Sequence, residues 1–290
     1  LYYRVPQDGS YELEIRDSIY RGREDFVYRI TVGEIPFLTN LFPLGIQSGQ
    51  SGTVEVHGWN LPVDTITFDA TQKEPGSYPV SVQNRKFTSN VVSFAVDALP
   101  ELMEQEPNDD LGAAPPLKPP VIVNGRIDQP GDWDIFRFDG RAGGQVIVEV
   151  LARHLESPMD SLLKLTDADG KQLMINDDYE DLGSGLTTHH ADSQLHVTLP
   201  TDGSFFIHLG DAQKKGGPEY AYRLRISARR PDFELRVVPS TVSARPGSTT
   251  PVTIHALRRD GFDQDIKLSL KDAPEGFAIS GGWVPAGHAG

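Results

Sequence analysis

A gapless internal repeat is the feature of this 290-residue chain that most restricts its fold. Residues 5–32 align with residues 199–226 at a constant offset, and eight positions are identical. The identical pairs are Pro6/Pro200, Asp8/Asp202, Gly9/Gly203, Ser10/Ser204, Asp17/Asp211, Gly22/Gly216, Tyr28/Tyr222 and Arg29/Arg223. Between them, apolar or aromatic residues recur at alternate positions, as a half-buried pair of strands requires. Each copy is therefore predicted to be a turn, a strand, a loop and a second strand.

The positions of the two copies predict how the domains are arranged. The second copy closes a domain that starts near residue 101, whereas the first copy stands at the start of the chain. Residues 1–34 are therefore expected to be the C-terminal remnant of a first domain that the N-terminus cuts. Residues 101–229 are expected to be a complete domain of the same kind.

The body of this complete domain has the rhythm of an antiparallel sandwich. Short runs rich in β-branched and aromatic residues alternate with turn residues. These runs cover residues 121–127, 134–139, 145–151, 162–166, 172–175, 194–199, 205–209 and 220–226. Their spacing predicts an all-β fold of tandem β-sandwich modules, with a jelly-roll-like sandwich at 101–229. Residues 100–120, rich in acidic residues and proline, are interpreted as a connector rather than a packed element.

Two further segments have the patterning of immunoglobulin-like modules. Residues 49–61 form a glycine-bounded alternating strand that ends in a Gly-Trp-Asn-Leu turn, and residues 89–96 form a closing strand. On these features, residues 36–98 resemble the TIG/IPT-type immunoglobulin-like fold. Residues 232–290 resemble the start of another immunoglobulin-like domain, and carry too few strand signals for a complete sandwich.

Charge and composition exclude several classes of protein. The net charge of −14 and the lack of a lysine and arginine cluster oppose binding to phosphate backbones, so no nucleic acid partner is expected. The chain has no cysteine, which excludes disulfides and thiolate zinc sites. No apolar run reaches the roughly 18 residues that a membrane helix needs. The chain is therefore expected to have no membrane segment.

An acidic strip ahead of the predicted sandwich has the residue types of a hard-cation site. Glu104, Glu106 and Asn108 occupy alternate positions, and the proline at 107 favours an extended conformation for the residue before it. In a strand, this spacing places the three side chains on one side. Carboxylate and amide oxygens suit Ca²⁺, whereas Mg²⁺ wants a tighter octahedron and Zn²⁺ prefers nitrogen and sulfur. The strip therefore predicts a calcium site, with a solvated acidic linker as the alternative.

The body of the domain must complete such a site, because Ca²⁺ takes roughly six to eight oxygen ligands. The best candidates are the carboxylates of Asp132 and Asp134, which lie just ahead of the aromatic run 135–138.

These motifs together resemble the pre-peptidase C-terminal domain family over residues 101–228. The matching motifs are Glu-x-Glu-Pro-Asn-Asp at 104–109, Gly-Asp-x-Asp-x-Phe-x-Phe at 131–138, Asn-Asp-Asp at 176–178, Asp-Ser at 192–193 and Leu-Pro-x-Asp-Gly-x-Phe at 199–205. The family is similar in fold to the collagen-binding domain of secreted bacterial collagenases, whose acidic segment chelates calcium. Carried over, the resemblance implies the ligands Glu104, Glu106, Asn108, Asp109 and Asp134. Asp132 stands close to the collagenase position but not on it.

A second, weaker candidate set of carboxylates would gather at one end of the sandwich if the strand ends that carry them are adjacent. It consists of Asp160, Asp177, Asp178 and Asp192. The preferred alternative is that residues 176–178 simply turn the chain, because short Asx side chains bond neighbouring amides.

The sequence assembles no catalytic site. His189 and His190 lack a His-Glu-x-x-His motif, and Ser184 lacks the strand-to-helix setting of a nucleophile. The chain is therefore expected not to be an enzyme. We interpret it as a calcium-binding accessory or architectural segment of a large secreted or cell-surface bacterial protein. The alternative is a polymer-binding module of a secreted hydrolase, with a collagen-like protein or a polysaccharide as ligand.

The expected partners are an extracellular polymer or neighbouring domains of the same protein, and the chain is expected to be monomeric. An extracellular or cell-surface location follows from the resemblance and from a calcium site suited to millimolar external calcium.

Overall fold

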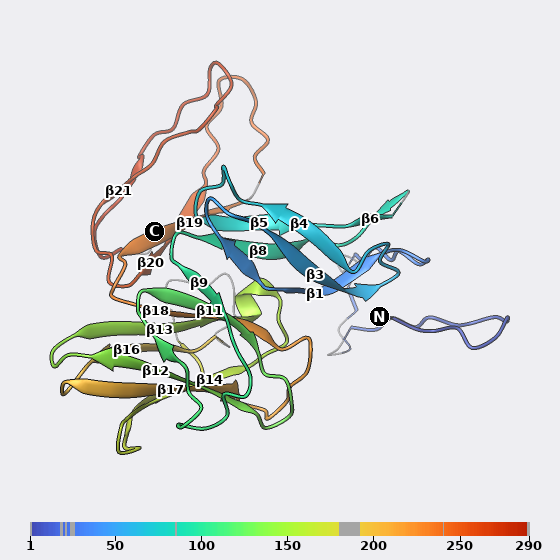
Figure 1. Cartoon of the computed structure of the whole chain (residues 1–290). Coiled ribbons are helices and arrows are strands. Elements are labelled where there is room, and N and C mark those ends of the chain that lie inside the picture. The colour runs from blue at the N-terminus through green and yellow to red at the C-terminus, as the bar shows by residue number, and fades with distance from the viewer. Residues whose placement is uncertain are drawn as a thin grey trace.

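The computed structural model describes residues 2–17, 20, 22–23, 27–84, 86–179, 192–239 and 241–288, and it consists almost wholly of strands (Figure 1). Among these residues, the single helical element is a 3-10 turn, η1, at Arg153–Leu155. No helix in the described part of the chain is long and apolar enough to span a bilayer. The predicted all-β fold is confirmed.

Two five-stranded sheets form the central sandwich. One sheet, here the β12 sheet, has the order β10-β12-β17-β14-β15, and the other, the β18 sheet, has the order β16-β13-β18-β11-β9. The strands are β9 (Glu101–Met103), β10 (Pro116–Leu117), β11 (Val121–Arg126), β12 (Trp133–Gly140), β13 (Gln145–Leu151), β14 (Ser161–Asp167), β15 (Gln172–Asn176), β16 (Gln194–Thr198), β17 (Gly203–Asp211) and β18 (Ala221–Ser227). The eight predicted strands of this module are confirmed, each with its bounds within two residues.

The prediction that residues 100–120 are an unpacked connector is wrong. Strand β9 pairs in parallel with β11, and β10 pairs in parallel with β12. Asn108, Ala114 and Leu117 of this segment are buried. The acidic and proline-rich composition conceals this packing, because the segment lies against both sheets with few apolar side chains of its own.

The core of the central sandwich lies between the two sheets. Alternate residues of each strand point into it, as the period of a strand requires. Its largest fully buried aromatic residues are Phe136, Phe138, Phe205 and Tyr222. The rings of Phe138 and Phe205 face each other with centroids 5.7 Å apart.

The two copies of the internal repeat differ in structure. In the second copy, β17 pairs with β12 and β14, and β18 pairs with β11 and β13. In the first copy, no strand forms among the described residues before Phe37, so the predicted strand pair is wrong there. Tyr28 is 73% exposed, whereas its counterpart Tyr222 is completely buried. The hairpin needs flanking strands equivalent to β11–β14, and the described part of residues 1–34 provides none.

A smaller N-terminal sandwich precedes the central one. Its two main sheets have the orders β1-β3-β4 and β2-β8-β5, and a short hairpin, β6-β7, adds to it. The strands are β1 (Phe37–Phe42), β2 (Gly45–Gln47), β3 (Ser51–Trp59), β4 (Thr65–Asp69), β5 (Gly76–Val80), β6 (Gln83–Asn84), β7 (Phe87–Thr88) and β8 (Val92–Asp97). Leu38, Val54 and Phe94 lie in its core. The resemblance of this module to the TIG/IPT-type fold stays a prediction.

The C-terminal segment contributes two antiparallel strand pairs. Strand β19 (Asp232–Val238) pairs with β20 (Thr253–Arg259) along its whole length. Two short strands, β21 (Ile266–Lys267) and β22 (Trp283–Val284), pair with each other. Ala256, Ile266 and Val284 form the small core of this segment.

The N-terminal sandwich lies against the outer face of the β18 sheet. The Arg126 guanidinium donates a hydrogen bond to Glu55 at 2.5 Å and lies 3.5 Å from the centre of the Phe42 ring. Arg223, fully buried, lies so close to Gly45 that a Cβ there would overlap its guanidinium. Charged residues of the central sandwich thus pair with, or pack against, the module before it.

The C-terminal segment meets the same outer face. Arg225 forms ion pairs with Glu149 on β13 at 2.6 Å and with the buried Asp260 at 2.9 Å. Arg230 pairs with Asp97 of the N-terminal sandwich at 3.0 Å. Both flanking modules therefore lie on one side of the central sandwich, and its β12 sheet faces away from them (Figure 1).

Candidate metal centre

The segment from Glu104 to Asp109 crosses from one sheet of the central sandwich to the other. At its start, the Glu104 amide donates to Asn124 O on β11, and near its end the Ile135 amide of β12 donates to Asn108 O. None of its residues lies in a strand, so the predicted period-2 strand is wrong there. The backbone hydrogen bonds to two different sheets prevent it from continuing β9 as a strand.

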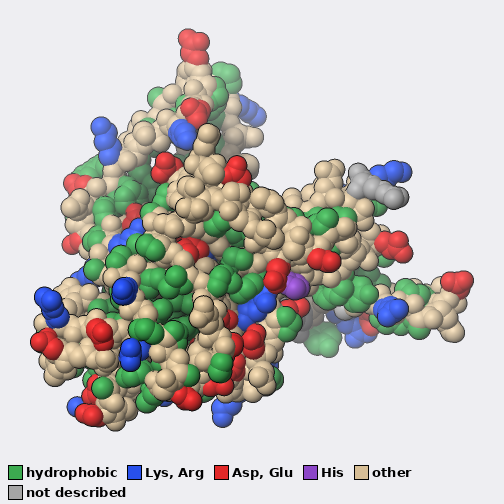
Figure 2. Space-filling view, in the orientation of Figure 1, with side chains coloured by type: hydrophobic (Ala, Val, Ile, Leu, Met, Phe, Trp, Pro, Cys, Tyr) green, Lys and Arg blue, Asp and Glu red, His purple; other side chains and the backbone are tan. Residues whose placement is uncertain are grey.

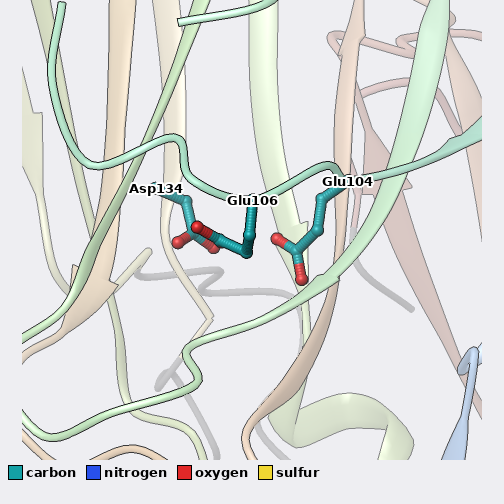
Figure 3. Close-up of side chains that lie close together, drawn as sticks. All are labelled: Glu104, Glu106 and Asp134. Atoms are coloured by element: carbon teal, nitrogen blue, oxygen red, sulfur yellow. The ribbon is translucent and has the colours of Figure 1, made fainter. Parts of the chain in front are cut away.

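Three carboxylates nevertheless converge at this crossing. Glu104, Glu106 and Asp134 each offer an oxygen, and the three oxygens lie within 4.8 Å of one another. The two glutamates hang from the crossing segment and the aspartate comes from β12, with their carboxylates close together (Figure 3). We call these three side chains the carboxylate cluster. Sequence reasoning named all three of them.

Tyr222 ties two members of the cluster together. Its hydroxyl lies 2.7 Å from Glu104 Oε2 and 2.5 Å from Asp134 Oδ2. Gly125 on β11 leaves the room for this contact, since a Cβ there would overlap both Glu104 Oε2 and the hydroxyl. Sequence reasoning missed Tyr222 as a site residue. The signal was its retention in both copies of the repeat, as Tyr28 and Tyr222.

Burial changes the protonation of this cluster. Burial raises the pKa of Glu104 to about 7, and the hydrogen bonds from Tyr222 and the Arg126 amide act against that rise. Burial, followed by the nearby Glu104 charge, raises the pKa of Asp134 to about 10. Burial and the two carboxylates also raise the pKa of the Tyr222 hydroxyl. Without a cation, the pair of Glu104 and Asp134 therefore holds a proton at neutral pH.

Several buried polar atoms next to the cluster have no hydrogen-bond partner among the described residues. They are Asn108 Oδ1 and Nδ2 and Asp134 Oδ1, and both side chains are fully buried. An unpaired buried polar atom costs roughly 1–3 kcal/mol. Oxygen-only donors, a surplus of negative charge and orphaned oxygens are the chemistry that a hard divalent cation satisfies. The residues therefore fit Ca²⁺.

An acidic cleft of about 340 Å³ opens beside the cluster. It is lined by Glu106, Pro107, Asp109, Asp128, Gln129 and Asp132. Burial raises the pKa of Glu106, and the charges of Asp132, Asp109 and Asp128 add to that rise. Of the predicted ligands, Asp109 and Asp132 thus line this cleft and do not belong to the carboxylate cluster. Asp128, which also lines the cleft, was not predicted from the sequence to be a site residue. Asp132 Oδ1 also accepts from the Trp133 amide at 2.9 Å.

The second predicted set does not form a comparable cluster in the described part of the chain. Asp192 is committed elsewhere, since its carboxylate accepts hydrogen bonds from the amides of residues 152–154 and contacts His154 Nδ1 at 2.5 Å. Asp160 accepts from the Gln213 amide group at 2.9 Å, and Asp177 accepts from the Asp178 amide at 3.1 Å. The turn interpretation of 176–178 agrees with this last bond. Ser184, His189 and His190 lie outside the described residues.

Comparison with known proteins gives five findings. No family model matches the chain. Over 122 residues, or 41% of its length, the chain is 34% identical to a probable subtilase-type serine protease of Deinococcus radiodurans, and the match spans 15% of that protease. The pre-peptidase C-terminal domain of a collagenase from Bacillus anthracis matches at 10% identity and a TM-score of 0.31, over 42% of this chain and 99% of that domain. The chain is thus similar, over less than half of its length, to a subtilase-type protease and to a pre-peptidase C-terminal domain.

Two other solved structures match at lower scores. PliG, a periplasmic inhibitor of g-type lysozyme from Salmonella Typhimurium, matches at 16% identity and a TM-score of 0.23, over 44% of this chain and 96% of its own. A structure of promiscuous carbohydrate-binding modules of the β-sandwich superfamily matches at 11% identity and a TM-score of 0.23, over 67% and 98%.

Proposed function

We propose that this chain is a non-catalytic, Ca²⁺-binding accessory segment of a large secreted or cell-surface protein. The observation that carries the proposal is the carboxylate cluster of Glu104, Glu106 and Asp134, with an unpaired Asp134 oxygen buried beside it. A cation held there would be bound by the crossing segment and by β12, and so would tie the two sheets together. Its charge would act against the burial and the Glu104 repulsion that together raise the pKa of Asp134.

The role of calcium in this proposal is to stabilise a junction. A ligand that binds only the folded state, at a hundredfold excess over its Kd, adds about 2.7 kcal/mol to stability. The cluster exists only when the crossing segment, β12 and β18 are assembled, so the unfolded chain would bind the ion weakly.

The test is thermal unfolding of the whole chain, followed by calorimetry, in EDTA and in millimolar CaCl₂. Calcium is expected to raise the melting temperature of the transition that belongs to the central sandwich. The double variant Glu106→Gln with Asp134→Asn should lose this response. Burial raises the pKa of Asp134 to about 10, so the metal-free folded protein holds this side chain neutral, and asparagine, which is close to it in size, should not lower stability in EDTA.

Asp139→Asn is the matched control. Asp139 lies on β12 like Asp134, is exposed, and accepts a hydrogen bond from Ser204 rather than joining the cluster. This variant should keep the full calcium response. A wild-type chain whose melting is the same in EDTA and in calcium would overturn the proposal.

A polymer-binding role is the second candidate, and one feature of the β12 sheet favours it. Trp133 lies against Gly210 of β17, where a Cβ would stand 3.1 Å from an indole carbon. Lys164 lies 5.2 Å from the centre of the same ring. Because Gly210 has no side chain, the indole can pack closely against β17. A flat aromatic ring beside a cation can stack on a sugar or a peptide side chain.

Pull-down on collagen, cellulose and chitin separates the two roles. A polymer-binding module would sediment with one of these matrices and lose that property in Trp133→Ala. An architectural segment would stay in the supernatant with all three.

A further inference from the structure

The carboxylate cluster and the boundary with the N-terminal sandwich share one residue of β11. The Arg126 amide donates to Glu104 Oε1 at 2.5 Å, inside the central sandwich. The guanidinium of the same residue pairs with Glu55 at 2.5 Å and lies 3.5 Å from the centre of the Phe42 ring. Glu55 and Phe42 belong to β3 and β1 of the N-terminal sandwich. One residue thus contacts the cluster with its backbone and the neighbouring module with its side chain.

Strand β18 repeats this arrangement with two consecutive residues. Tyr222 points inward and holds Glu104 and Asp134, while Arg223 points outward against Gly45. Arg223 is also paired, at 2.6 Å, with Glu101, which lies on β9 three residues before Glu104. The carboxylate cluster and the boundary with the N-terminal sandwich therefore lie on opposite faces of the same part of the β18 sheet.

We infer that a divalent cation at the cluster fixes the orientation of the N-terminal sandwich relative to the central one, with Arg126 as the residue that couples the two. The inference rests on the proposed function, because it assigns a consequence to the same bound ion. A cation that draws Glu104 into its ligand shell positions the carboxylate that the Arg126 amide contacts. The backbone position of Arg126 in turn determines where its guanidinium lies against Glu55 and Phe42.

Two details favour a direct effect of the cation on the boundary through Arg126 over a general stiffening of the central sandwich. Arg126 Nε is buried and has no hydrogen-bond partner among the described residues, so the guanidinium is held at the boundary by Glu55 and the ring face alone. No intermediate side chain is needed between the two sites. Coupling between two binding events is reciprocal, so a weakened boundary must also weaken the binding of the ion.

Calorimetric titration of the whole chain with Ca²⁺ tests this reciprocity. Glu55→Gln keeps the size of the side chain, removes the negative charge that pairs with Arg126 and touches no member of the cluster. It is expected to weaken Ca²⁺ binding by about fivefold or more, the low end of common coupling strengths. Asp97→Asn is the control, because it breaks a different ion pair at the boundary, with Arg230, that has no contact with the cluster. It should leave the affinity unchanged.

A distance measurement gives an independent readout. The chain has no cysteine, so Ser77→Cys and Lys171→Cys place one spin label on each sandwich. The distance distribution should narrow on adding Ca²⁺ in the wild-type background, and Glu55→Gln should abolish the narrowing.

The outcomes separate this inference from the proposed function. If the wild-type chain binds no Ca²⁺, both are overturned. If it binds Ca²⁺ and Glu55→Gln leaves affinity and distances unchanged, the coupling alone is overturned. If Asp97→Asn weakens binding as much as Glu55→Gln, the effect is not specific to Arg126 and the coupling through it is likewise overturned.

Discussion

Tyr222 and Arg223 are consecutive residues of β18 whose side chains serve opposite faces of one sheet. The Tyr222 hydroxyl lies 2.5 Å from Asp134 in the interior, and the Arg223 guanidinium lies 2.6 Å from Glu101 on the outer side. The alternation of a strand thus places the carboxylate cluster and the module boundary back to back. Both residues are fully buried, and both are retained in the first copy of the repeat as Tyr28 and Arg29.

Without metal, the stability of the central sandwich should fall as the pH rises. The folded-state pKa is about 7 for Glu104 and about 10 for Asp134, above the ordinary values of 4.5 and 3.8. The folded state therefore binds more protons than the unfolded state between these limits, and stability decreases by up to about 1.4 kcal/mol per pH unit for each group. Urea unfolding in EDTA from pH 5 to pH 8 measures this slope.

Asp134→Asn should flatten that slope, because it removes the group with the larger rise in pKa. Saturating Ca²⁺ should also flatten or reverse it, since a cation favours the ionised carboxylates. A metal-free protein whose stability rises with pH over this range would contradict the assigned protonation.

Tyr222→Phe should destabilise the metal-free protein. The change removes the hydroxyl that lies 2.7 Å from Glu104 and 2.5 Å from Asp134, so these buried carboxyl groups lose a hydrogen-bond partner, at a cost of roughly 1–3 kcal/mol. Chemical unfolding in EDTA measures this loss. Tyr220→Phe is the control, because the Tyr220 hydroxyl makes no hydrogen bond among the described residues. An equal loss in both variants would show that the hydroxyl of Tyr222 has no special role.

Gly45→Ala should disturb the boundary between the two sandwiches. The added Cβ would meet Nη1 of Arg223 at 2.5 Å and would also crowd the Ala95 carbonyl. Limited proteolysis should cut between the modules faster in this variant than in the wild type. Gly52→Ala is the matched control on β3, where the nearest atom is the flexible end of Ile46 at 3.0 Å. Equal cleavage rates in wild type and Gly45→Ala would mean that the boundary tolerates the added methyl group.

Asp192→Ala should destabilise the central sandwich without changing its response to calcium. Asp192 accepts hydrogen bonds from three consecutive amides of residues 152–154, so its loss leaves buried donors unpaired, at roughly 1–3 kcal/mol. Melting curves with and without Ca²⁺ give both quantities. A loss of the calcium response in this variant would instead support Asp192 as a metal ligand, as in the second predicted set of carboxylates.

The strand pattern of the central sandwich was predictable from the sequence. Its eight main strands are runs rich in β-branched, aromatic and other apolar residues, and local turn residues bound them, so each run carries its own signal. The pairings of β9 and β10 were not predictable, because each strand is short and takes its stability from a parallel neighbour that is distant in sequence. The same reason explains the failed prediction for residues 5–32. Their pattern suits a hairpin, but a hairpin pattern alone does not supply the strands beside it.

The candidate site was predictable in its residues and not in its geometry. The acidic motif and the aspartate ahead of the aromatic strand named Glu104, Glu106 and Asp134. Tyr222 was missed because an aromatic residue at a strand position is most simply explained by burial. Its hydroxyl acquires a role only when β18 and β12 face each other across the core.

The chain enters and leaves the central sandwich at the same end. Glu101 on β9 and Arg225 on β18 are both partners of Ile122 on β11, so the incoming and outgoing strands flank one point. Next to that point, Asp97 and Arg230 pair at 3.0 Å across the two junctions. The first and last strands of the central sandwich thus lie on either side of β11, so the two flanking modules meet beside this sandwich rather than at its opposite ends.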